Sequence, residues 1–179
     1  LLKAVNIQAH PIVLRTNDEG LFKPKHPVLA CNHCITKVFL NDDNAIYLDA
    51  TSQDYRFPAF RADDHGALAF DFLAGVREPI KTPAPELCDG KHAEENVEVK
   101  KDGAIIVTAN NNYSGQYEAR LRAVWKSIPT NMRPRIMQQY LNSIAPGSRL
   151  LKFNISDPTD LDTPFSMSYS FENKTLVSR

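Results

Sequence analysis

The stretch "CNHCITKVFLNDDNAIYLDAT", Cys31 to Thr51, predicts two β-strands joined by a tight turn. Its polar centre, "NDDN", separates two runs that are rich in β-branched and aromatic residues. Antiparallel pairing is the natural outcome of so short a connection, so we expect a hairpin made of about residues 28–40 and 45–49. Because it carries a histidine, His33, and an aspartate, Asp49, this hairpin is the candidate functional segment.

His33 and Asp49 have the chemistry of a catalytic pair. An imidazole acts as base and acid near neutral pH, and a carboxylate bound to its second nitrogen fixes the tautomer and stabilises the imidazolium. With a regular two-residue turn at Asp42 and Asp43, however, His33 would face Ser52 and Asp49 would point to the other side. A functional pair therefore requires an irregular hairpin, either with an odd number of residues in the turn or with a β-bulge. The alternative is that the two are unrelated polar residues on half-exposed strands.

The remainder of the first half predicts a further strand and then a linker. Residues 7–16 are apolar in the middle and precede the turn "NDEG", which indicates a buried strand. Residues 52–85 show turns, aromatic residues and no sustained period. The proline-containing segment "KTPAPELCDGKH" is the best linker candidate, so we assign residues 1–85 and 86–179 to separate domains. The chain opens without Met, and we read Leu1 as an internal point of a longer protein.

The second half predicts an α+β domain. Alternating residues around the turn "KDG" predict a hairpin, and Ser114 is placed to cap a helix that ends near Pro129. A second helix follows and ends at Pro146 and Gly147. Two strands close the chain, so two helices can cover one face of an antiparallel sheet. We expect both helices to bury one apolar stripe: Tyr117, Leu121, Val124, Trp125 and Ile128 in the first, and Ile136, Met137, Tyr140, Leu141 and Ile144 in the second.

The composition narrows the class of protein. Hydrophobic residues make up 42% of the chain, charged residues 23%, and the formal net charge is +0, which is typical of a globular domain. A nucleic-acid-binding protein normally has a basic balance or a basic face, so we expect no nucleic-acid partner. No apolar run approaches the ~20 residues that cross a bilayer, so we expect no membrane span.

The stretch "ACNHCITKVFLNDDNAIYLDATS" resembles the segment of bacterial transglutaminase-like proteins that carries the catalytic His and Asp. Upstream, "LLKAVNIQAHPIVLRT" is similar to the end of the family's nucleophile-bearing helix and the strand after it. Downstream, "ENVEVKKDGAIIVTANNNYSGQYEARLR" and "SDPTDLDTPFSMSYSF" resemble the C-terminal domain of the large members. The matching positions in the hairpin are Asn32, His33, Tyr47, Leu48, Asp49, Ala50 and Thr51.

The resemblance implies the antiparallel half of a papain-like core, followed by a small α+β accessory domain. In that family a Cys thiolate attacks an amide of a protein or peptide substrate, and hydrolysis or acyl transfer follows. His33 would be the base and Asp49 its orienting residue, with Asn32, Tyr47 and Thr51 as supporting residues. The family's nucleophile precedes the segment that matches residues 1–5, so no residue of this chain occupies its position.

Several further expectations follow from the same resemblance. The isolated chain should not catalyse the family reaction, and the nucleophile would come from the missing N-terminal part of the same protein or from a partner chain. The reaction needs no organic cofactor, and we assign no metal ligands. Related proteins of this layout are often exported by bacteria, which implies a periplasmic or cell-surface location.

Three alternatives remain open at this stage. The chain could be a non-catalytic binding or structural module that kept the scaffold. Cys31, on the His33 face of an extended strand, could act as a substitute nucleophile, although it lies on the wrong wall of the cleft. A zinc site is a further alternative, although its spacing fits no standard finger; its candidate ligands are Cys31, His33, Cys34, Cys88 and His92.

Overall fold

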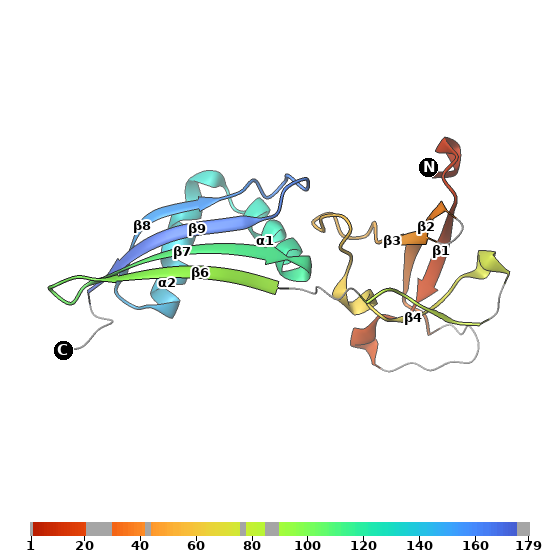
Figure 1. Cartoon of the computed structure of the whole chain (residues 1–179), viewed down its shortest axis with the longest axis horizontal. Helices are drawn as coiled ribbons and strands as arrows, with labels where there is room; N and C mark the ends of the chain where they lie inside the picture. The colour runs from red at the N-terminus through yellow and green to blue at the C-terminus, as the bar shows by residue number, and fades with distance from the viewer. Residues whose placement is uncertain (1, 21–29, 42–43, 76–77, 85–89, 175–179) are drawn as a thin grey trace. The chain divides into compact units, whose positions relative to one another are not determined.

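The chain forms two compact units, residues 1–88 (unit 1) and 89–179 (unit 2). The computed structural model describes residues 2–20, 30–41, 44–75, 78–84 and 90–174 (Figure 1). Two antiparallel sheets and two α-helices make the chain α+β, as the sequence predicts. The boundary expected between residues 85 and 86 lies outside the described residues.

Unit 1 is built on one antiparallel sheet with the strand order β3-β2-β1-β4-β5. Its connections contain short 3-10 helices, which are η1 (Leu2–Val5), η2 (Asn17–Glu19), η3 (Ala62–Asp64) and η4 (Phe72–Ala74). The strands are β1 (Ala9–Leu14), β2 (His33–Asn41), β3 (Asn44–Leu48), β4 (Leu68–Phe70) and β5 (Ile80–Lys81).

The β2–β3 hairpin has the irregularity that a His33–Asp49 pair requires. Phe39 pairs with Ala45 and Asn41 pairs with Asn44, so one extra residue, Leu40, lies between the two pairs. Such a bulge shifts the register by one residue and changes which side chains share a face. The predicted irregular hairpin is therefore confirmed, while the turn residues 42–43 lie outside the described residues.

The face of the sheet that carries His33 also carries the core of unit 1. Leu14 lies opposite His33, and Ile12 lies opposite Ile35. Ile12 and Leu14 are 0% exposed, and Ala67, Ala69, Tyr47 and Ile80 pack around them. The histidine therefore projects from the end of an apolar, tightly packed strand pair, which holds its backbone in place.

The sequence predicts some of the strands of unit 1 and misses others. The first strand is shorter than the expected residues 7–16, and the second begins at His33, because residues 30–32 are outside the sheet. Residues 52–85 show no sustained period in the sequence, but they contain β4 and β5. Strands of three and two residues are too short to show an alternating pattern.

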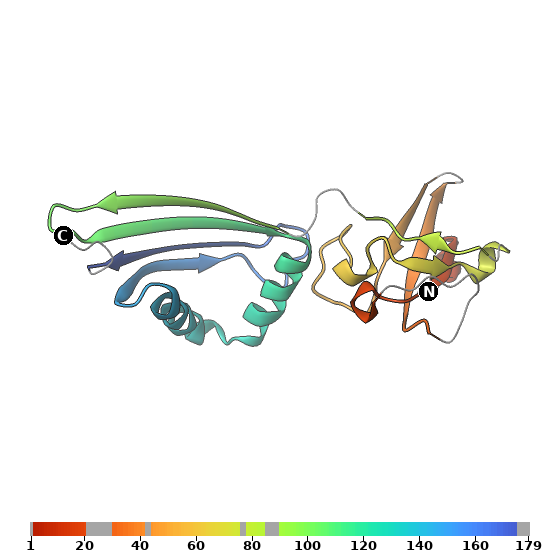
Figure 2. The same cartoon turned by 90° about the horizontal axis from the view of Figure 1, so that it is seen from below.

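Unit 2 has the predicted layout of two helices on one face of an antiparallel sheet, with the strand order β6-β7-β9-β8 (Figures 1 and 2). Within the described residues, no helix has both the length and the apolar character that a bilayer span requires. The elements are β6 (Gly90–Val99), β7 (Ile105–Ser114), α1 (Gly115–Ser127), η5 (Thr130–Met132), α2 (Arg133–Ile144), β8 (Ser148–Ile155) and β9 (Ser166–Asn173).

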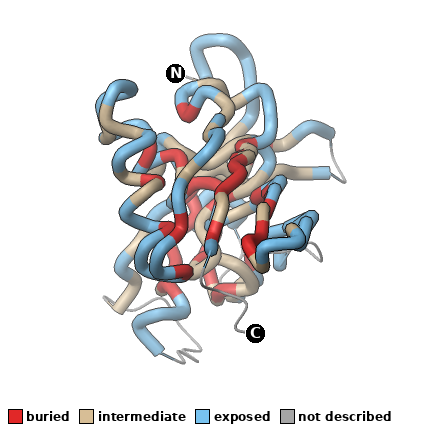
Figure 3. Tube along the Cα trace, turned by 90° about the vertical axis from the view of Figure 1, so that its left-hand side faces the viewer, coloured by how far each residue is buried: buried red, intermediate tan, exposed pale blue. Residues whose placement is uncertain are grey.

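The core of unit 2 lies between the helices and the inner strands. Alternate residues of β7 are buried. Figure 3 colours the described residues of the chain by burial, with buried residues in red. Trp125, Met137 and Leu141 are buried as predicted. The predicted stripes were too wide, because only the strip of each helix that faces the sheet is covered; the exposed members are Tyr117, Val124, Tyr140 and Ile144.

A buried ion pair fixes the loop between β8 and β9. Arg122 is 0% exposed, and its Nη2 donates to Glu118 Oε1 at 2.7 Å. The guanidinium also donates to the backbone carbonyls of Asp157, Asp160 and Thr163, while Glu118 Oε1 accepts from the Phe165 N–H at 3.1 Å. The Arg122–Glu118 pair thus forms hydrogen bonds with backbone groups of the loop "SDPTDLDTPF" from its buried side.

We predict that Arg122→Ala lowers the free energy of unfolding of unit 2 by about 3–5 kcal/mol, because it leaves the Glu118 carboxylate buried without its partner. Trp125 is the single tryptophan of the chain, so denaturant unfolding followed by tryptophan fluorescence reports on unit 2. Arg120→Ala, an exposed change on the same helix, is the control and should cost less than about 1 kcal/mol. Equal effects of the two substitutions would contradict this role for Arg122.

Candidate functional site

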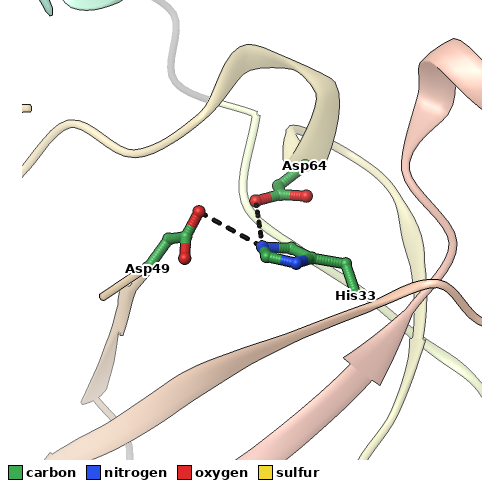
Figure 4. A group of neighbouring side chains, drawn as sticks. All are labelled: His33, Asp49 and Asp64. Atoms are coloured by element: carbon green, nitrogen blue, oxygen red, sulfur yellow. Dashed lines mark hydrogen bonds and ion pairs between the residues drawn. The ribbon is translucent and has the colours of Figure 1, made fainter. Parts of the chain in front are cut away.

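His33 and Asp49 meet across the end of the β2–β3 hairpin (Figure 4). The imidazole Nε2–H donates to Asp49 Oδ2 at 3.2 Å. The His33 side chain is 12% exposed and that of Asp49 is 1% exposed, so the carboxylate is buried and the imidazole reaches solvent. The structure thus brings together the two residues predicted to be catalytic.

Thr51 holds the Asp49 carboxylate in position. Its backbone N–H and its hydroxyl both donate to Asp49 Oδ1, at 2.9 and 2.7 Å. Because Oδ1 is occupied by Thr51, Oδ2 is left to face His33. Thr51 is therefore in direct contact with the pair, as expected of a supporting residue.

The other two supporting residues lie elsewhere. Asn32 joins the ends of β1 and β2, since its Oδ1 accepts from the Thr16 N–H at 2.9 Å and its Nδ2 donates to Thr16 Oγ1 at 2.8 Å. Tyr47 packs against the apolar core, where burial raises the pKa of its hydroxyl. Both residues shape the strands that position His33.

A third residue, Asp64, completes the cluster, and the sequence did not single it out. Its Oδ2 lies 3.5 Å from His33 Nε2, the same nitrogen that faces Asp49 (Figure 4). The side chain is 0% exposed, and neither carboxylate oxygen has a hydrogen-bond partner among the described residues. A buried polar group without a partner is rare in proteins and calls for an explanation.

The backbone around Asp64 is well fixed even though its carboxylate is not. Asp64 ends the 3-10 helix η3, and its carbonyl accepts from the hydroxyl of the buried Thr82. The nearby guanidinium of Arg61 is held by Asp63, to which its Nε donates at 2.9 Å. The turn therefore directs the Asp64 side chain inward, while the carboxylate of Asp63 binds Arg61.

The two carboxylates have opposite pKa shifts. Burial raises the pKa of Asp49, but hydrogen bonds from Thr51 and His33 outweigh it, so the net pKa lies below the ordinary value. Burial also dominates at Asp64 and, together with the charges of Asp63 and Asp49, raises its pKa to about 6 against the opposing charge of His33. Asp49 is thus set up as the ionised partner of His33.

Neither cysteine that the structure describes joins this cluster. Cys34 pairs with Val13 on β1, so it points to the opposite face from His33, and it is exposed. Burial raises the pKa of the Cys31 thiol, whereas an activated nucleophile needs a lowered one. Cys88 lies outside the described residues, and His92 is exposed on β6 beside Glu94. Within the described ranges, the His, Cys, Asp and Glu side chains that converge as metal ligands contain no cysteine.

A second His–Asp pair lies on the same sheet. His10 Nδ1 is 2.9 Å from both oxygens of Asp71, and His10 borders a groove of about 590 Å³ lined also by Lys3, Thr36 and Leu73. Asp71 Oδ1 also accepts from the N–H groups of Leu73 and Ala74. Asp71 Oδ1 is therefore the N-cap of η4 as well as a partner of His10, which gives Asp71 a structural role besides the pair.

Comparisons with known proteins leave the family open. No protein-family model matches this chain, and no curated protein or solved structure is significantly similar to it. The basis for a function is therefore the geometry of the His33 cluster together with the residues that carry the resemblance.

We predict that Asp64→Asn stabilises unit 1 at pH 8 by roughly 2–3 kcal/mol, because it removes a buried charge that lacks a hydrogen-bond partner. The folded-state pKa of about 6 lies above that of an unfolded aspartate, so stability falls as pH rises through 6. The gain should shrink at pH 5, where the wild-type carboxyl binds a proton.

Asp49→Asn is the matched control, and it should lower stability at pH 8 because the Asp49 pKa is depressed in the fold. Hydrogen exchange of the β1 and β2 amides, with a chelator present, reports on unit 1 alone. Destabilisation by Asp64→Asn at pH 8 would show that the Asp64 carboxylate has a partner after all.

Proposed function

We propose that unit 1 carries the general base and the orienting carboxylate of a transglutaminase-like thiol enzyme, which hydrolyses or transfers acyl groups from protein or peptide amides. The observation that carries this proposal is the hydrogen bond from His33 Nε2 to Asp49 Oδ2 at 3.2 Å. It joins the two residues of the resemblance, and Thr51, a third, secures the carboxylate.

In this proposal each ring nitrogen has its own role. Asp49 accepts the Nε2 proton, so Nδ1 is the nitrogen that can take a proton from a thiol. The thiolate then attacks the amide carbonyl, and the imidazolium, stabilised by Asp49, gives its proton to the leaving amine. Water or a second amine attacks the resulting thioester and releases the thiol. Hydrolysis and transfer differ only in this last step.

The nucleophile belongs, in this proposal, to the helix that precedes the segment matching residues 1–5 in the family. Neither described cysteine fits, because Cys34 points to the other face and the Cys31 thiol has a raised pKa. The cysteine is supplied by an N-terminal part of the same protein or by a partner chain. By the same resemblance, we propose that the protein works in the periplasm or at the cell surface.

The competing proposal is a non-catalytic module that kept only the scaffold. A buried carboxylate bound to a solvent-reaching imidazole does not by itself separate the two proposals, because His10 and Asp71 have the same arrangement. The catalytic proposal is favoured because His33, Asp49 and Thr51 all stand at positions of the resemblance and Thr51 secures the carboxylate. The His10–Asp71 pair supports the catalytic reading less well, because Asp71 is already needed as a helix cap.

We predict that His33→Gln and Asp49→Asn each lower kcat/KM by roughly 10²–10⁴-fold in the protein as its source makes it. Amine incorporation into casein and release of ammonia from the same substrate measure transfer and hydrolysis together. His10→Gln is the matched control and should keep activity within about twofold, since it alters the other His–Asp pair.

Alkylation by iodoacetamide should abolish the activity, and mass spectrometry should place the inactivating modification on a cysteine other than Cys31, Cys34 and Cys88. The proposal is overturned if His10→Gln removes activity and His33→Gln does not. It is equally overturned if a Cys31→Ser or Cys34→Ser variant is inactive while correctly folded.

A further inference from the structure

We propose that His33, Asp49 and Asp64 form a binding site for one divalent transition-metal ion, with Zn²⁺ as the best-matched probe. The binding itself does not rest on the proposed function, because it depends only on these three side chains. The site differs from the zinc site considered from the sequence, since its ligands are one imidazole and two carboxylates.

The first observation is the carboxylate of Asp64, which lies 3.5 Å from His33 Nε2 but has no hydrogen bond within the part of the chain that the structure describes. It is fully buried, points at the cluster, and has no hydrogen-bond partner on either oxygen among the described residues. His33 cannot serve both carboxylates, because Nε2 carries at most one proton and lies closer to Asp49. A buried carboxylate is normally hydrogen-bonded, paired or bound to a metal.

The second observation is the spacing of the three ligand atoms. Nε2 lies 3.2 Å from Asp49 Oδ2 and 3.5 Å from Asp64 Oδ2, and one ligand atom from each residue falls within 4.8 Å of the other two. In a tetrahedral zinc centre with bonds of about 2.1 Å, neighbouring ligands are roughly 3.4 Å apart. Both nitrogen-to-oxygen distances are therefore close to those of a zinc centre, and three protein ligands are the usual number when the fourth is solvent.

The charges and ligand types select the class of ion. Two carboxylates and a neutral imidazole balance a divalent cation, and the arginine beside them, Arg61, is bound to Asp63. An imidazole ligand suits Zn²⁺, Co²⁺ and related ions, whereas Ca²⁺ and Mg²⁺ prefer all-oxygen ligands. We therefore expect Zn²⁺ and Co²⁺ to bind and Ca²⁺ and Mg²⁺ not to compete.

Metal binding has a consequence for His33, and this step does rest on the proposed function. A metal bound to Nε2 takes the lone pair of that nitrogen, so the ring proton must reside on Nδ1. Nδ1 can then no longer accept a proton from a thiol, and Asp49 serves the metal instead of orienting the imidazole. Occupancy by the ion and action as a base exclude each other, so the ion is an inhibitor of the proposed reaction.

The test is calorimetric titration of chelator-stripped protein with Zn²⁺. We expect one equivalent to bind, and Asp64→Asn to weaken the binding by roughly 100-fold or more, because even changes beyond the direct ligands cost 10–100-fold. His33→Gln should weaken Zn²⁺ binding to the same extent. This second variant shows whether the loss in Asp64→Asn comes from misfolding of that variant alone. His10→Gln, which alters an imidazole with a single carboxylate partner, should leave the affinity unchanged.

Co²⁺ gives a second readout, since its visible absorption reports tetrahedral coordination and should be lost in Asp64→Asn. The proposal is overturned if no saturable Zn²⁺ binding occurs, or if Asp64→Asn binds as tightly as the wild type. Loss of binding in His92→Gln alone would assign the ion to the exposed His92–Glu94 pair and would also overturn it. None of these results depends on enzymatic activity, so a failure of the proposed function would leave them unaffected.

Discussion

The β-bulge at Leu40 determines on which face of the sheet Asp49 lies, and the candidate site depends on this choice. Side chains alternate along a strand, so a register shifted by one residue would turn Asp49 away from His33. The pairing of β2 with β1 fixes the other partner, because Leu14 and Ile12 anchor the His33 face in the core. The acid–base pair thus follows from strand register, which the apolar residues enforce.

The buried charged side chains that the structure describes differ in how many hydrogen bonds they form. Arg122 and Glu118 bind each other and several backbone groups, and Asp71 accepts from His10 and two backbone amides. Asp49 is likewise bound on both oxygens. Asp64 is the exception among the buried carboxylates that the structure describes, and it lies beside the same nitrogen as Asp49. A buried charge without a hydrogen bond lowers the stability of the fold. Proteins keep such a group mainly where it has a functional role.

The sequence predicted the parts of the fold that have long periodic patterns. The hairpin, both helices and the α+β layout of unit 2 were read from alternation, helical spacing and turn residues. The short strands β4 and β5 were missed, because two or three residues cannot show a period. The predicted apolar stripes of α1 and α2 are too wide, because helical spacing does not show how much of a helix the sheet covers.

The candidate site was also predictable only in part. His33, Asp49 and Thr51 stand in a recognisable order along one hairpin, and the need for an irregular turn followed from counting residues. Asp64 could not be found this way, since "ADDHG" contains two adjacent aspartates that only the geometry of η3 tells apart. Asp63 turns to Arg61 while Asp64 turns inward, and that difference is created by tertiary packing around Thr82.

The position of the His33 ring proton, observed by nitrogen NMR in chelator-treated protein, tests the His33–Asp49 pair most directly. When the ring carries one proton, we expect that proton on Nε2, and we expect Asp49→Asn to change this pattern. A proton on Nδ1 in the wild type, or a pattern that Asp49→Asn leaves unchanged, would contradict the pairing of His33 with Asp49 on which the proposed function depends.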